Sequence, residues 1–253
     1  MKAFFNNIKE RWVKYLIETF VIVIGILGAF AIESWGESRK ENEEEHRLLI
    51  QLKQEYEQNL SQLNSKISIR NELINSAEIL LEVIDKKKTL SQDSFDLYLS
   101  RTLVTPTFDP VNNDLAVSGK LYILNNEELR IALSHWSSNV LDVIEEEEIW
   151  LGYRDEHYLP FLIEHYSVRT LMSHVWADFE ITGQVLIEKT EQSNISMGKS
   201  NRKLSYHDLI NDTPLEDHLA IAITTNNLTN LLSITVKERI QDMLDLINSE
   251  LQK

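Results

Sequence analysis

The sequence predicts an all-α fold: an N-terminal transmembrane helix that continues into a long amphipathic helix, followed by an extracytoplasmic helical bundle. Three observations support this. Residues 15–35 are apolar over the length of a bilayer, apolar side chains then recur every three or four residues, and only four Gly and four Pro fall in the last 217 residues. So few helix breakers favour long helices over the many turns of a sandwich or barrel.

The transmembrane helix is placed between Tyr15 and Trp35. No charged residue occurs from Thr19 to Ile32, and roughly 20 mostly apolar residues cross the hydrocarbon core. Trp12 and Tyr15 flank one end of the segment and Trp35 the other. We expect these rings to act as interface anchors in the two headgroup layers, because amphipathic aromatic side chains concentrate there.

The flanking charges predict the orientation of this helix. Lys2, Lys9, Arg11 and Lys14 precede it, against a single acidic residue, Glu10. Because Lys and Arg are retained on the cytoplasmic side, we expect the chain to cross the inner (cytoplasmic) membrane once, with its N-terminus in the cytoplasm. Its three regions are then a basic cytoplasmic N-terminus at 1–14, the membrane helix at 15–35 and an acidic extracytoplasmic, or periplasmic, domain at 36–253.

A cleaved signal peptide is the alternative interpretation. A basic start, an apolar run and Ala29-Phe30-Ala31 as a cleavage site are all present. The long basic region, Glu18 within the apolar segment and Trp35 at its end favour an uncleaved anchor instead. The bulk of the chain is exported in either case.

One stripe of the membrane helix combines a charge with small residues. Glu18, Ile22, Gly25 and Ala29 fall on one face, and Gly25 and Ala29 form a small-xxx-small pair that lets another helix approach closely. This pattern predicts a contact with a second membrane helix, with Glu18 as a proton or ion site. Alternatively, Glu18 is solvated by headgroups and by Lys14 one turn earlier.

Composition excludes several function classes. The first 36 residues carry a net charge of +1, so the remainder carries −16 of the total −15. Such an acidic surface disfavours nucleic acid and anionic lipid surfaces. The chain has no cysteine, which excludes disulfides, thiol nucleophiles and cysteine zinc sites.

The first exported helix shows a helical period over about ten turns, interrupted at Arg70. Its apolar positions are Leu49, Leu52, Tyr56, Leu60, Leu63, Ile67, Ile74, Ala77, Leu81 and Ile84. Four asparagines weaken a coiled-coil interpretation: Asn59, Asn64, Asn71 and Asn75. The pattern therefore favours an amphipathic helix that packs on its own domain.

Shorter elements follow. Residues 85–88 end the first helix, Ser91 caps a helix that reaches Leu103, and 105–114 form a loop. Residues 115–124 form a helical turn closed by Gly119 and then an apolar connector.

Asn126 caps a further helix, which continues through the acidic run Glu145–Glu148 to Tyr158 and kinks at Pro160. The acidic run is interpreted as a solvated face. Residues 161–179 form another helix.

The C-terminal part divides into a polar segment and a long helix. Residues 188–212 are polar and poor in large apolar side chains, and are expected to form a mobile loop or domain edge. A capping-box pattern of Thr213 with Glu216, and Pro214 at the first helical position, starts the last helix. Residues 224–227 are expected to bend or divide it.

Two stretches resemble an uncharacterised single-pass membrane protein family, a domain of unknown function abundant in Bacteroidota. The first is ETFVIVIGILGAFAIESWGESRKENEEEHRLLIQLKQEYEQN at Glu18–Asn59, and the second is TFDPVNNDLAVSGKLYILNNEELRIALSHW at Thr107–Trp136. The second contains a signature carried by Ser118, Gly119, Leu121, Leu124, Asn126, Glu128, Leu129 and Arg130. The resemblance implies the membrane topology and supplies no chemistry.

Within this family-like polar motif, Asn126, Glu128 and Arg130 have two interpretations. They form a polar contact that holds the loop at Asp114, or they serve as ordinary capping and surface charge.

No catalytic, cofactor-binding or metal-ligating signature is present. A pair of Glu-x-x-His motifs, His-Glu-x-x-His, phosphate-binding loops and the Gly-x-Ser-x-Gly elbow are all missing. Glu156, His157 and His165 could at most form a weak metal site, which Pro160 disturbs. We therefore predict no catalytic residue, no metal site and no cofactor.

The leading functional hypothesis is a non-enzymatic, membrane-anchored helical scaffold or interaction protein. Its expected partners are the lipid bilayer and a second copy of itself or another membrane helix, with no nucleic acid. An oligomeric channel or ion-coupled subunit that uses Glu18 is the alternative. A metal-dependent enzyme around Glu156, His157 and His165 is a weaker one.

Overall fold

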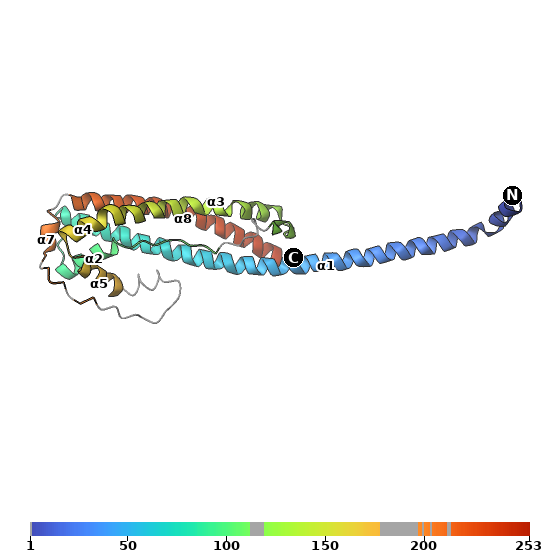
Figure 1. The fold of residues 1–253 in the computed structure, drawn as a ribbon, viewed down its shortest axis with the longest axis horizontal. Coiled ribbons are helices and arrows are strands. Elements are labelled where there is room, and N and C mark those ends of the chain that lie inside the picture. Colours follow the sequence, from blue (N-terminus) through green and yellow to red (C-terminus); the bar gives the residue numbers. More distant parts are fainter. Residues whose placement is uncertain (1, 112–118, 178–196, 199, 203, 212–213) are drawn as a thin grey trace.

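The computed structural model describes residues 2–111, 119–177, 197–198, 200–202, 204–211 and 214–253. Three long helices lie side by side as a bundle, and the N-terminal part of one of them projects alone from one end (Figure 1). We call this the proximal end of the bundle, and the opposite end, where the short helices gather, the distal end. All regular structure in the described residues is helical, as the sequence predicts.

Helix α1 (Lys2–Ile84) contains both the apolar N-terminal segment and the first helix of the bundle. Its 83 residues span about 125 Å at 1.5 Å per residue. Among its side chains whose burial the structure describes, the first that is buried is Leu49. From there the helix packs against its own domain, which confirms the prediction from the periodic apolar positions.

Helix α1 ends where the sequence predicts, through backbone geometry at a lysine. Lys86 takes the left-handed conformation, with φ of 60°. Its N–H donates to Val83 O at 3.0 Å and that of Lys87 donates to Glu82 O at 2.8 Å, the paired bonds of a Schellman motif. The next helix, α2 (Gln92–Arg101), starts at the predicted cap, since Ser91 accepts from Ser94 N–H.

A π-helical turn accommodates Pro160. Helix α3 (Glu127–Tyr153) runs into the turn η2 (Arg154–Tyr158) and then α4 (Leu159–His165). The N–H of Leu159 reaches back to Arg154 O, a wider turn that leaves room for a residue without an N–H.

The prediction of one helix over 161–179 is wrong, because the described residues of this range form two helices. Tyr166 adopts an extended backbone, with φ of −144° and ψ of −172°, and divides α4 from α5 (Val168–Ala177). Arg202 stabilises the break by donating to the carbonyls of Ile163 at 2.7 Å and Glu164 at 2.9 Å. A guanidinium suits these carbonyls because they lack helical partners.

The segment predicted as a loop, 188–212, contains a short helix, α7 (Tyr206–Leu209), and much of the rest lies outside the described residues. Helix α8 (Pro214–Leu251) begins at the predicted proline. It is not divided at 224–227. Asn226 and Thr229 donate to the carbonyls of Ala222 and Thr225, each at 2.9 Å, so polar groups are satisfied within the helix.

A 3₁₀ turn lies between α2 and α3. Gly119 has φ of 69° and precedes this turn, η1 (Lys120–Ile123), rather than closing a described helix.

Helices α1 and α3 run from the proximal to the distal end, and α8 returns between them to end where α1 leaves the bundle (Figure 1).

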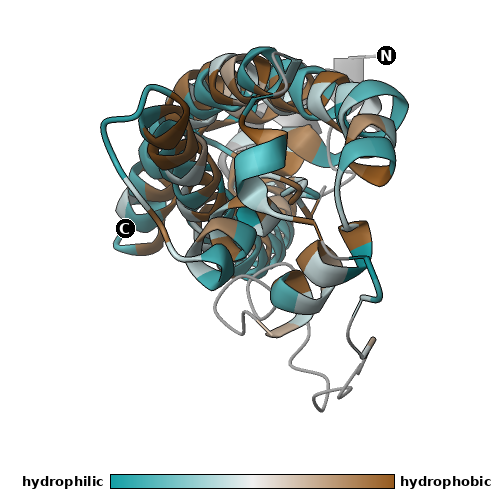
Figure 2. Ribbon diagram, turned by 90° about the vertical axis from the view of Figure 1, so that its left-hand side faces the viewer, coloured by the Kyte–Doolittle hydropathy of each residue, from teal (hydrophilic) through white to brown (hydrophobic). Residues whose placement is uncertain are grey.

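The bundle has two apolar clusters separated by a polar layer. The proximal cluster contains Leu52, Leu63 and Trp136, and the distal cluster contains Leu80, Phe95 and Tyr158. Figure 2 looks from the distal end and shows hydrophobic and hydrophilic residues on the helices of the bundle. Buried polar side chains lie between the clusters: Lys66, Arg70, Glu147, Asn226, Thr229, Asn230 and Ser233.

An ion pair between Arg70 and Glu147 is the centre of this polar layer. Their side chains are 1% and 4% exposed and are directly hydrogen-bonded. Arg70 also donates to Ser233 Oγ at 2.9 Å, so it joins α1, α3 and α8. Burial lowers the pKa of the neighbouring Lys66, which lies in the field of both Glu147 and Arg70.

The extended segment after α2 is held by side chains instead of by secondary structure. From α3, Glu147 Oε2 accepts the N–H of Phe108 at 2.8 Å and Trp150 donates to Val104 O at 3.0 Å. From α1, Asn59 both donates to Val111 O and accepts its N–H, at 3.0 and 2.8 Å. Backbone groups that a loop would leave to water are thus satisfied inside the bundle.

Replacing Arg70 by Met should lower the free energy of unfolding by about 3 kcal/mol, because Glu147 would stay buried without its principal cation. Urea denaturation of the full chain in detergent micelles, followed by far-UV circular dichroism, measures this. Arg39→Met is the control, since the Arg39–Glu43 pair is 67% and 61% exposed and should contribute less than about 1 kcal/mol. Equal losses in the two variants would contradict the central role of the buried pair.

Candidate functional site

The N-terminal segment of α1 is the largest apolar surface of the described chain. Every large apolar side chain from Leu16 to Ile32 is between 44% and 72% exposed. None of this segment is buried against the bundle, and it is long and apolar enough to cross a bilayer. A helix that is apolar around its circumference and bare of protein contacts is typical of a membrane anchor.

The predicted packing stripe lies on this bare surface. Glu18, Ile22, Gly25 and Ala29 are all exposed, and a Cβ built on Gly25 would meet nothing within 4 Å. No hydrogen bond or ion pair joins Glu18 to another described residue. The stripe is therefore free to contact a second helix.

The predicted interface anchors mark the two ends of the same segment. Trp12, Tyr15 and Trp35 are 56%, 52% and 68% exposed. Trp12 and Trp35 are 23 residues apart on one continuous helix, or about 34 Å. This separation matches a hydrocarbon core about 30 Å thick with a ring in each headgroup layer.

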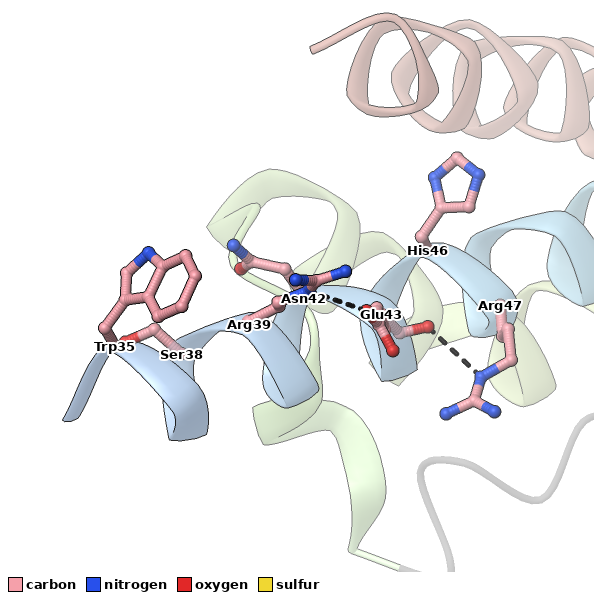
Figure 3. Close-up of a pocket in the computed structure, with 7 residues that line it drawn as sticks. All are labelled: Trp35, Ser38, Arg39, Asn42, Glu43, His46 and Arg47. Atoms are coloured by element: carbon pink, nitrogen blue, oxygen red, sulfur yellow. Dashed lines mark hydrogen bonds and ion pairs between the residues drawn. The ribbon is translucent and has the colours of Figure 1, made fainter. Parts of the chain in front are cut away.

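A shallow hollow of about 620 Å³ lies on α1 just after Trp35. It is lined by Trp35, Ser38, Arg39, Asn42, Glu43, His46 and Arg47. Figure 3 shows these side chains projecting from one helix, with Glu43 bonded to Arg39 through its carboxylate and to Arg47 through its carbonyl oxygen, each at 3.2 Å. Trp35, at the end of the apolar segment, is thus followed on the same helix by side chains of both charges.

Asn126 of the family-like polar motif and the preceding Asn125 join the proximal ends of the three long helices. Asn126 caps α3 by accepting from Leu129 N–H at 2.9 Å, and its amide donates to Glu250 of α8 at 2.6 Å. The N–H of Asn125 donates to Glu45 of α1, also at 2.6 Å. Lys253 and then Asn126 lower the pKa of Glu250, so this contact favours the ionised carboxylate.

The other two residues of the motif behave differently. Arg130 donates to Leu124 O at 2.7 Å and so fixes the turn before α3. Glu128 is exposed beside a hollow of about 370 Å³ between α3 and α8. Asp114, to which these residues were expected to reach, lies outside the described residues.

The distal end holds a cluster of histidine and tyrosine side chains. Tyr153 Oη and His218 Nδ1 are 2.8 Å apart, and His218 stacks on Tyr158 with ring centroids 5.1 Å apart. Burial lowers the pKa of His218 from 6.5, Asp217 opposes this and His157 adds to it.

The side chains around this cluster pack on aromatic rings. The described residues bring no three His, Asp or Glu side chains together as metal ligands. His165 stacks instead on Phe161, with ring centroids 4.7 Å apart, and His157 lies against Tyr153.

A second buried carboxylate ties the short distal helices together. Asp96 of α2 is hydrogen-bonded to Tyr166, and Gln92 donates to it at 3.1 Å. Burial raises the pKa of Asp96, against the lowering effect of these hydrogen bonds. These contacts join α2 to the segment between α4 and α5.

Two carboxylate partners were missed: Glu250 for Asn126 and Glu45 for Asn125. Glu45 belongs to a charged stretch in which no single carboxylate stands out by spacing, and Glu250 is the only charged residue between Asp245 and Lys253. Only the antiparallel return of α8 brings Glu250 beside Asn126, so a local pattern could not have identified it.

The fold and this surface define a class: an all-α protein in which a long apolar N-terminal helix is continuous with a three-helix bundle. The chain belongs to the family of unknown function DUF6090, whose sequence pattern matches residues 18–148. The match covers most of α1, the extended segment and α3 up to the residue after Glu147. Comparison with curated proteins and with solved structures gives no match.

Replacing Asn126 by Ala should lower the free energy of unfolding by about 1 kcal/mol, because it removes the cap of α3. The bond to Glu250 is lost as well. Glu128→Ala is the matched control in the same helical turn, and its loss should be about 0.3 kcal/mol from the helix dipole alone. Urea denaturation in detergent tests both, and equal losses would contradict a joining role for Asn126.

The histidine cluster predicts a pH dependence of stability. Because the folded pKa of His218 is lowered from 6.5, the unfolded chain takes up the proton first as pH falls. Stability is therefore complete above about pH 7 and decreases through about pH 6 and below. His218→Gln should reduce the loss of unfolding free energy between about pH 7.5 and 5.5, whereas His135→Gln, on an exposed part of α3, should leave it as in the wild type.

Proposed function

We propose that this protein is a non-enzymatic scaffold anchored in the cytoplasmic membrane by one helix, with its acidic bundle outside the cytoplasm. The observation that carries the proposal is the bare apolar surface of α1, whose side chains from Leu16 to Ile32 are at least 44% exposed. In water this surface would be unstable or would aggregate. In a bilayer it is solvated by lipid, with Trp12 and Trp35 in the two headgroup layers.

The direction of insertion follows from the charges around the anchor. Lys2, Lys9, Arg11 and Lys14 precede it, and the residues after position 36 carry a net charge of −16. Basic residues stay on the cytoplasmic side. Glu18 then lies one turn inside the cytoplasmic interface, near Lys14.

A scaffold function is supported by the rigid connection between anchor and bundle. Helix α1 passes from Trp35 to Ile84 without a break, so the bundle extends to about 74 Å from the headgroup layer. The polar contacts of its proximal end and of its buried layer link α1 to α3 and α8. A bundle of this kind holds its surfaces at a fixed height above the membrane.

Self-association is part of the proposal. The stripe of Glu18, Ile22, Gly25 and Ala29 has no partner among the described residues, and small residues permit close helix approach in lipid. Copies of the chain held in one membrane also have a high effective concentration.

Single cysteines test the topology, because the chain has none of its own. Ser134→Cys, exposed on α3, should react with a membrane-impermeant maleimide in spheroplasts, whereas Asn6→Cys should react only after lysis. The opposite labelling would overturn the orientation. Recovery of the labelled chain at 29.5 kDa distinguishes an uncleaved anchor from a signal peptide cut at Ala31.

A further inference from the structure

Helix α8 is more apolar than its place in the bundle requires. No Asp, Glu, Lys or Arg occurs from Leu219 to Val236, in a chain of which 26% is charged. Its apolar window is hydrophobic enough to cross a membrane, yet only 39% of that window is buried. The inward face accounts for part of this composition, so the outward face needs a separate explanation.

The outward face of α8 carries apolar side chains at heptad spacing. Ile221, Leu228 and Leu231 are 37%, 43% and 57% exposed, and Thr224 and Thr235 are exposed between and after them. These positions follow the alternating gaps of three and four that place residues along one seam. Ile234, 44% exposed, borders the seam on one side.

The neighbouring stripe of α1 is uncharged from Asn64 to Asn75 and then reaches Glu78. Asn64, Ser68, Asn71 and Asn75 recur at gaps of four and three, and all are exposed. Asn71 accepts a hydrogen bond from Asn230 of α8 at 2.9 Å, so the two stripes adjoin. Three of the four asparagines that argue against a coiled coil within α1 thus lie on this shared surface.

We infer that this uncharged face of α8 and α1 is where a second copy of the chain binds, with the two α8 helices parallel and in register. The inference rests on the proposed membrane anchoring. Copies inserted in the same direction have parallel α8 helices, and a two-fold axis along the membrane normal brings identical residues of the seam together.

The shared membrane favours a second copy as the occupant, and charge limits where that copy can bind. Two exported domains that each carry −16 repel one another over most of their surfaces, because like charges across an interface are unfavourable. The α8 seam, which has no charged residue from Leu219 to Val236, lets them approach without opposing carboxylates. A seam of few apolar residues is sufficient here because the shared membrane already confines both copies.

Disulfide crosslinking in native membranes tests the contact, since a disulfide needs Cα atoms within roughly 7 Å. Leu228→Cys and Leu231→Cys, each alone in the full chain, should give a covalent species of twice 29.5 kDa on oxidation. Ile149→Cys on α3 is equally exposed at 55% and should remain a single chain. Crosslinking of all three variants alike, or of none, overturns the inference.

A second pair of variants tests the seam itself. Adding Leu231→Glu to Leu228→Cys should abolish the crosslink, because it brings two carboxylates together, while adding Ile149→Glu should leave it intact. Both changes are at exposed positions and should not alter unfolding. A crosslink that survives Leu231→Glu, or a predominant Ile221→Cys to Thr235→Cys crosslink between coexpressed variants, overturns the parallel seam.

The same membrane fractions separate the two proposals. Chain recovered in the soluble fraction contradicts the proposed anchoring. Chain that is fully membrane-bound but gives no crosslink at Leu228 or Leu231 contradicts only the inference about α8.

Discussion

The ion pair between Arg70 and Glu147 is the contact on which the arrangement of the bundle depends. It lies between the two apolar clusters of the bundle. Arg70 reaches Ser233, and Glu147 reaches the N–H of Phe108, so one charge pair fixes three helices and the extended segment. A buried charge tolerates no other register, because any shift would leave it unpaired in a low dielectric.

The sequence predicts the elements of this fold well where the signal is local. The periodic apolar positions of α1, the cap residues Ser91 and Asn126, and Pro214 at the start of α8 all identify helices that the structure contains. Each depends on neighbours within one or two turns. The exposed apolar N-terminal segment of α1 is also predicted from local sequence, since its composition alone distinguishes it from the bundle.

The candidate contacts are predicted less well because they join distant segments. Arg70 is identified only as an interruption of an apolar stripe, and Glu147 only as one residue of a solvated acidic run. A signal was present: Glu147 lies four residues after Val143 and three before Trp150, on the buried face of α3. Two opposite charges, each on the apolar face of its helix, indicate a buried pair. Choosing this pair among the many charges nevertheless requires the packing of α3 against α1.

Helix α1 joins the apolar N-terminal segment to the bundle without a break. Because no flexible linker separates Trp35 from Leu49, a rotation of the apolar segment about its axis turns the bundle with it. The stripe that α1 shares with α8 turns as well, and so do the small residues of the apolar segment. In the proposed membrane-anchored arrangement, contacts in the lipid and contacts above it are therefore constrained to form together. A continuous helix that carries both surfaces is a physical means of coupling the two kinds of contact.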